Sequence, residues 1–291
     1  MSAQAGAGAL AAVLAATLWG STGTTQALFL SAADPIAVGA LRLIVGAAAL
    51  LCMLVVPPNG LRALKRLPWR GVLPAGCAIA AYNLLFFQAV LHAGVGVGTA
   101  VAIGSAPIWA TAWEMVRKRR ALDPLRIAAQ SAAIAGVAVL SLASDGGEAG
   151  GTGVLLALGA GAAYATYSLI TSATGRHAPP VAMAAATFAT AGLAAAPALA
   201  FVSLGGLDDA PAMAAVGFLG VAATGVAYAL YTWGLTRISA STGVTLALCE
   251  PVAAWALATA LLGEETTVAK ATGALLILIG LVVFTRAKSE P

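Results

Sequence analysis

Two stripes of aromatic and polar residues, one in each half of the chain, have the spacing of a single face of an α-helix. The first stripe consists of Trp19, Thr22, Gly23 and Gln26, and the second consists of Tyr164, Tyr167, Ser168 and Thr171. In each stripe the residues stand at positions i, i+3, i+4 and i+7, and the second follows the first at an offset of 145. Rings beside hydroxyl and amide groups suit a neutral or zwitterionic ligand with an apolar body. Its rings stack on the protein's rings, and the polar groups meet its polar head.

The composition places these stripes in a membrane. Of the 291 residues 60% are hydrophobic and only 9% are charged, which is too little polar surface to cover a soluble globule. Apolar runs of about 20 residues, enough to cross about 30 Å of hydrocarbon, recur along the whole chain. The predicted spans are 8–30, 35–56, 71–91, 95–117, 124–143, 152–173, 179–202, 211–235, 239–262 and 267–285. We therefore expect an all-α polytopic protein of ten transmembrane helices in one bundle, embedded in the lipid bilayer and acting as a monomer.

Several of these spans carry further polar or aromatic residues. They are Tyr82, Asn83, Phe86, Phe87, Thr99, Trp109, Thr224, Tyr228, Tyr231, Thr232, Thr242 and Thr245. A polar atom facing lipid costs several kcal/mol when unsatisfied, so we expect these residues to face inward. The predicted substrate site is Trp19, Gln26, Tyr82, Asn83, Phe86, Thr99, Trp109, Tyr164, Tyr167, Ser168, Tyr228 and Thr245. The alternative is that these groups only join helices or anchor them at the membrane interface.

Two charges lie deep inside predicted spans, away from their ends. Glu250 is about ten residues into its span, near the midplane, where burial in hydrocarbon disfavours a charged carboxylate. It is a candidate for proton coupling or for binding a substrate ammonium; alternatively it makes a structural hydrogen bond or pairs with Arg42. For Arg42 we favour a structural role. Glu114 precedes Arg117 and Lys118 by one helical turn, which predicts an interfacial salt link.

The basic residues orient the bundle. With the N-terminus in the cytoplasm, thirteen of the fifteen Lys and Arg fall on the inside, leaving Lys270 outside and Arg42 in a span. The positive-inside rule therefore predicts that both termini are cytoplasmic. The net charge of +4 reflects this topology. We interpret the basic run Arg117–Arg120 as a solvated loop beside lipid, and we expect no nucleic-acid partner.

The second half of the chain repeats the first. Pro107 and Pro251 are 144 positions apart, and each interrupts a predicted span. Such a proline removes a helical hydrogen bond, and a matched pair of breaks points to a transport site with Pro107 and Pro251 as hinges. Because each copy has five spans, the second enters the membrane from the opposite side. The expected units are repeat 1–143, an external linker 144–151 and an inverted repeat 152–291 around a central cavity.

The chain resembles the drug/metabolite transporter superfamily, in particular its ten-helix bacterial amino-acid and metabolite exporters. The resemblance rests on the 5+5 spans, on Ala40-Leu-Arg-Leu-Ile-Val-Gly46, on Ser-Ala-Pro107 and Cys-Glu-Pro251, and on Gly-Glu-Glu265-Thr. Overall, the chain is most similar to the aromatic amino-acid exporter branch. The resemblance implies a basket of helices around a cavity and the export of small amphipathic solutes.

Other chemistry has little support in the sequence. Cys52, Cys77 and Cys249 lie within spans without paired spacing, so we expect neither a disulfide nor a metal site. A GxxxxGK[ST] loop is absent, which argues against ATP-driven pumping, and we expect no cofactor. The favoured hypothesis is a secondary transporter that exports neutral, chiefly aromatic amino acids by alternating access. The alternatives are an exporter of other drugs or metabolites, an intramembrane enzyme acting on lipid-like substrates, and a channel or scaffold.

Overall fold

Helices form all the regular structure in the computed structural model, which describes residues 2–56, 60–119, 123–143, 150–175 and 178–287. The expected all-α architecture is therefore confirmed over these residues. Nine of the described helices are long and apolar enough to cross a membrane. The longest is twice the usual length and turns back on itself, so it accounts for two of the ten predicted spans.

The first half of the chain contributes five long helical segments. They are α1 (Ala3–Phe29), α2 (Pro35–Val55), the two arms of α4 (Trp69–Lys118) and α5 (Pro124–Leu142), with the short α3 (Gly60–Ala63) between α2 and α4. The two arms of α4 join at Gly94, whose φ of 78° and ψ of 161° are not helical. These angles suit glycine and almost no other residue, so the chain reverses there without a loop.

The second half repeats this order with more local irregularity. Its helices are α6 (Gly151–Thr174), α7 (Pro180–Ala195), α8 (Ala210–Gly220), α9 (Ala227–Leu235), α10 (Ala240–Leu246), α11 (Glu250–Leu257) and α12 (Val268–Arg286). A π-helical turn, Val221–Val226, joins α8 to α9, and a 3-10 turn, Ala247–Cys249, joins α10 to α11. Each joined pair forms one span, so this half also supplies five.

Small residues let the two halves pack closely. The last helices of the halves, α5 and α12, pack against each other, and each has a glycine in the contact: Gly136 and Gly280, which are 144 positions apart. A Cβ on Gly136 would lie 2.7 Å from the Gly273 carbonyl oxygen, and one on Gly280 would lie 2.7 Å from that of Ala129. Close backbone approach of this kind is how membrane helices associate without a hydrophobic driving force. The equivalent glycines thus serve the same contact from both sides.

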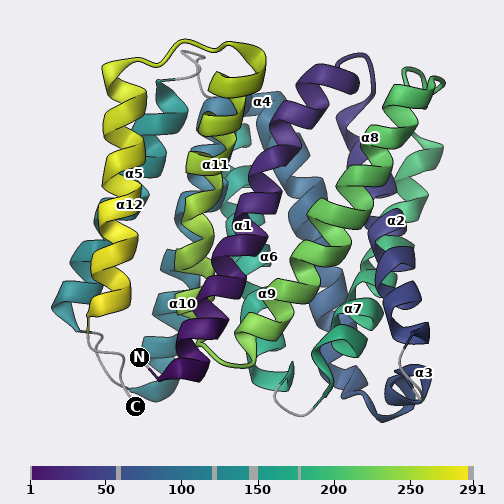
Figure 1. The fold of residues 1–291 in the computed structure, drawn as a ribbon, viewed down its shortest axis with the longest axis horizontal. Coiled ribbons are helices and arrows are strands. Elements are labelled where there is room, and N and C mark those ends of the chain that lie inside the picture. The colour runs from purple at the N-terminus through teal and green to yellow at the C-terminus, as the bar shows by residue number, and fades with distance from the viewer. Residues whose placement is uncertain (1, 57–59, 120–122, 144–149, 176–177, 288–291) are drawn as a thin grey trace.

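The bundle has two chemically different ends. Figure 1 shows the start of α1 and the end of α12 toward its lower edge. That edge, the basic face, carries Arg62, Lys65, Arg66, Arg70, Arg117, Lys118, Arg119, Arg126, Arg237 and Arg286 at helix ends. The other edge, the acidic face, carries Asp34, Asp208, Asp209, Glu264 and Glu265. Residues 144–149 of the expected linker lie outside the described residues.

Candidate functional site

A cavity of about 380 Å³ lies between the two halves of the bundle. Side chains from α1, α2, both arms of α4, α6, α9, α10 and α11 line it. The lining comprises Trp19, Gly20, Thr22, Gly23, Gln26, Pro35, Arg42, Tyr82, Asn83, Phe86, Phe87, Val90, Val95, Thr99, Ala102, Ile103, Tyr164, Tyr228, Val244, Ala247, Glu250 and Ala254. Its volume is that of a small-molecule site.

The cavity reaches the acidic face and is closed toward the basic face. At the acidic end it is bounded by Gln26, Pro35 and Val95, which lie near the ends of α1 and α2 and beside the turn of α4, and Val95 is 59% exposed. Toward the basic face the next residues are fully buried: Ser168 and Tyr231 have no exposed surface. Among the described residues, the exposed part of the cavity wall is therefore at its acidic end.

Packed aromatic rings form the closed end of the cavity. The Trp19 ring centroid lies 4.7 Å from that of Tyr228 and 6.2 Å from that of Tyr164, and Tyr82 lies 5.2 Å from Tyr164. Trp19 and Tyr164 are equivalent positions of the two repeats, and their rings meet edge to face. Trp19 Nε1 is buried and has no hydrogen-bond partner among the described residues. An indole N–H without a partner beside a cavity is available to a ligand or to water.

Arg42 and Glu250 bring opposite charges to the cavity wall. Arg42 lies on α2 and is only 8% exposed, and its Nε has no hydrogen-bond partner among the described residues. Glu250 begins α11, directly after the 3-10 turn. The ion pairs found within the described residues are Glu114–Lys118 and Glu264–Lys270, so the two cavity charges do not form one with each other. The pairing considered for them from the sequence is thus not present.

Most of the residues predicted for the substrate site line this cavity. These are Trp19, Gln26, Tyr82, Asn83, Phe86, Thr99, Tyr164 and Tyr228, together with Glu250. Asn83 donates through Nδ2 to the Ile79 carbonyl oxygen at 3.0 Å. Sequence reasoning did not assign Arg42 or Phe87 to the site, although a charge and a ring inside spans were the available signals.

The other four predicted residues lie away from the cavity. Tyr167 and Ser168 are packed beyond its closed end, where Ser168 Oγ is 3.1 Å from the Tyr231 hydroxyl. Thr245 is fully buried at the depth of the lining residues Val244 and Ala247, but on another face of α10. Helical spacing did not give the depth at which the cavity stops along α6. Trp109 is 46% exposed on the outer surface, where a lipid chain would cover it.

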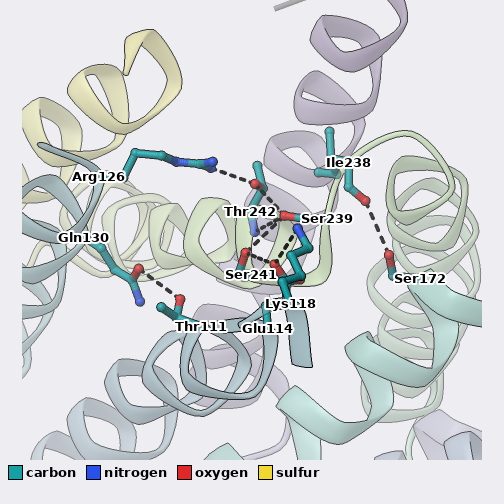
Figure 2. A network of polar contacts seen from close by, with 10 residues as sticks. All are labelled: Thr111, Glu114, Lys118, Arg126, Gln130, Ser172, Ile238, Ser239, Ser241 and Thr242. Atoms are coloured by element: carbon teal, nitrogen blue, oxygen red, sulfur yellow. Dashed lines mark hydrogen bonds and ion pairs between the residues drawn. The ribbon is translucent and has the colours of Figure 1, made fainter. Parts of the chain in front are cut away.

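Below the rings, a polar network joins the two halves near the basic face (Figure 2). At its centre the Glu114 carboxylate on α4 accepts hydrogen bonds from Ser241 at the start of α10. The Ser241 backbone N–H donates at 3.0 Å and its hydroxyl at 2.8 Å. A carboxylate at a helix N-terminus is favoured by the helix dipole and by the free N–H groups there. The predicted salt link to Lys118 is also present, but it is longer than these hydrogen bonds: Lys118 Nζ lies 3.8 Å from Glu114 Oε2.

A second contact of the network ties α5 to the same helix end. Arg126 Nη2 donates to Thr242 Oγ1 at 2.9 Å, and Ser239 Oγ lies 2.9 Å from that hydroxyl. The Arg126 guanidinium also covers the Phe284 ring at 4.3 Å, a cation–π contact with α12. We call the contacts of Glu114 and Arg126 with Ser241 and Thr242 the inner latch.

The two matched prolines lie in different local structure. Pro107 stands inside the helical second arm of α4, whereas Pro251 is the second residue of α11, just after the 3-10 turn Ala247–Cys249. The helix of the second repeat is therefore interrupted at the proline, and that of the first repeat is not.

A bundle of apolar helices in two five-helix repeats, with a cavity between them open to one face, defines a multi-pass membrane transporter. The chain belongs to the EamA-like transporter family, whose model matches it twice, over residues 6–142 and 151–286. It is 38% identical over 276 residues to the uncharacterized transporter YwfM of Bacillus subtilis (strain 168), covering 94% of this chain and 92% of that protein. It is a transporter and not an enzyme.

The fold is also similar to a solved crystal structure. The two superpose with a TM-score of 0.82 over 96% of each chain, at 22% sequence identity. This likeness concerns the fold alone.

Proposed function

We propose that this transporter exports neutral, chiefly aromatic amino acids and similar small metabolites. The observation that carries the proposal is the cavity itself, which combines an aromatic end with amides and two opposite charges at about 380 Å³. The rings of Trp19, Tyr82 and Tyr164 would stack on an apolar side chain, and the polar groups that line the rest of the cavity would meet the head group. The resemblance of the sequence to aromatic amino-acid exporters agrees with this assignment.

The orientation follows from the positive-inside rule. The basic face would lie in the cytoplasm with both termini, and the acidic face outside the inner membrane of a bacterium. In this orientation the structure is an outward-open state, and the inner latch closes the cytoplasmic route. Export then requires the latch to open so that substrate can enter from the cytoplasm.

Alternating access would arise from movement of repeat 1–143 against repeat 152–291 within one monomer. The two faces differ in what would hold them closed. At an offset of 144, Arg126 corresponds to Lys270, which pairs with Glu264 of its own half at 3.1 Å. Glu114 corresponds to Ala258 and Ser241 corresponds to Val97, so the Glu114–Ser241 contact has no polar counterpart at the acidic face. This difference favours the outward-open state without substrate. Pro107 and Pro251 are the proposed hinges.

Counterflow in proteoliposomes tests the proposal. Vesicles loaded with unlabelled L-phenylalanine should accumulate labelled L-phenylalanine or L-tryptophan saturably, and the D-enantiomers should compete poorly. Vesicles reconstituted with Tyr82→Ala protein are the site control, because this ring lines the cavity. Labelled flux equal to that of empty vesicles would reject amino-acid export. Saturable flux of a different metabolite would then keep the transporter and change its substrate.

A further inference from the structure

We propose that Arg42 and Glu250 are the specificity-determining residues of the cavity, with Arg42 binding the carboxylate and Glu250 binding the ammonium of a zwitterionic substrate. This assignment rests on the proposed function and goes beyond it, because it names the groups that recognise the head of the substrate.

The case for Arg42 is that it is buried in the cavity wall with its Nε unsatisfied. The residue is only 8% exposed, it lines the cavity, and its Nε has no hydrogen-bond partner among the described residues. A guanidinium buried in a membrane protein is costly unless an anion or an acceptor meets it. Guanidinium also matches the planar geometry of a carboxylate better than any other side chain does. A substrate carboxylate is therefore the group that this wall of the cavity lacks.

The case for Glu250 is that it lines the same cavity as Arg42 but belongs to a different helix. It belongs to α11, which packs on α1 and α12, whereas Arg42 belongs to α2, which packs on α7 and α8. Both residues line the same cavity, and no ion pair within 4.0 Å joins them among the described residues. A ligand head group with both charges could therefore pair with each of them.

Two opposite charges on separate walls select for a ligand that carries both. An amine without a carboxylate would pair with Glu250 but leave Arg42 buried and unpaired. An acid without an amine would do the reverse. Leaving one member of a buried charge pair unpaired costs enough to reduce affinity by about 30-fold or more. The aromatic rings of Trp19, Tyr82 and Tyr164 would hold the side chain of all three ligands alike, so the head group decides the difference.

Three ligands with one aromatic ring each test this inference. L-Phenylalanine carries both charges, 2-phenylethylamine carries only the ammonium, and 3-phenylpropionate carries only the carboxylate. We expect titration calorimetry on the purified wild-type protein to give a Kd for L-phenylalanine at least about 30-fold below that of either analogue. Equal affinity for the amino acid and either analogue would overturn the assignment, and flux of L-phenylalanine in the same preparation would still uphold the proposed function.

Charge-neutral variants then assign each end. Arg42→Gln should bind L-phenylalanine and 2-phenylethylamine within a few-fold of each other, because the carboxylate has lost its partner. Glu250→Gln should do the same for L-phenylalanine and 3-phenylpropionate. Arg286→Gln and Glu265→Gln are matched controls. Both residues are exposed at the ends of the bundle, and the two substitutions remove the same charges as the cavity variants do. They should keep the wild-type order of affinities.

The outcomes separate this role from others. If Glu250→Gln keeps the wild-type order, Glu250 does not bind the ammonium, and a changed pH profile of its flux would assign it to proton coupling instead. If Arg42→Gln does not fold, Arg42→Lys keeps the positive charge and should keep the preference for the amino acid. A wild-type protein that binds none of the three ligands would reject both this inference and amino-acid export.

Discussion

Removing the Glu114 carboxylate should open the basic face of the bundle. The carboxylate accepts two hydrogen bonds from Ser241, and its side chain is only 12% exposed. A hydrogen bond to a charged group contributes about 1.5–3 kcal/mol net. The exposed Lys118, 3.8 Å away, adds less than about 1 kcal/mol. Glu114→Ala should therefore shift the balance between the closed and open inner side by about 3 kcal/mol, or roughly 100-fold.

A buried thiol reports this shift. Thr245 is fully buried one turn along α10 from Ser241, and its hydroxyl donates to the Ser241 carbonyl oxygen at 2.7 Å. In protein whose three native cysteines are replaced by alanine, Thr245→Cys should react slowly with an impermeant maleimide applied to the basic face. Adding Glu114→Ala should raise the labelling rate up to about 100-fold, whereas Glu265→Ala should not change it. An unchanged rate in the Glu114 variant would refute the latch and the asymmetry drawn from it.

Two further predictions concern single residues. Trp19→Ala should weaken transport of aromatic substrates, measured as KM in counterflow, by about tenfold, because a ring–ring contact with its apolar area is lost. Trp109→Ala should leave KM unchanged, because this ring lies on the outer surface, and an equal loss in both variants would contradict the cavity as the site. Gly94→Ala should destabilise the protein by about 1–3 kcal/mol, seen as a lower unfolding temperature, since alanine is strained at φ 78°; an unchanged unfolding temperature would mean that the turn in α4 relaxes.

Most of the fold could be predicted from the internal repeat in the sequence. An offset of 144–145 makes Trp19 equivalent to Tyr164 and Gly136 equivalent to Gly280. In the structure the two rings are in contact, and each of the two glycines lies close to the backbone of the other helix in the α5–α12 pair. The sequence did not reveal that the third and fourth spans join at Gly94 without a loop, because glycines are frequent throughout this chain and only the backbone angles distinguish this one.

The sequence predicted which face of α6 points inward, but not how far the cavity extends along that helix. Periodicity identified the inward side of α6, yet Tyr164 lines the cavity while Tyr167 and Ser168, one turn further along, are packed beyond its end. How far a cavity extends depends on which helices meet below it, and spacing within one helix does not contain that information. In the same way, Glu114 was predicted to pair with its neighbour in sequence, whereas its shorter contacts are with a residue 127 positions away.

The most direct test of the central claim is an experimental structure with L-phenylalanine bound. We expect the ring of the ligand to lie against Trp19, Tyr82 and Tyr164, with its head group between Arg42 and Glu250. Ligand density outside this cavity, or density inside it with the head group turned away from both charges, would contradict it.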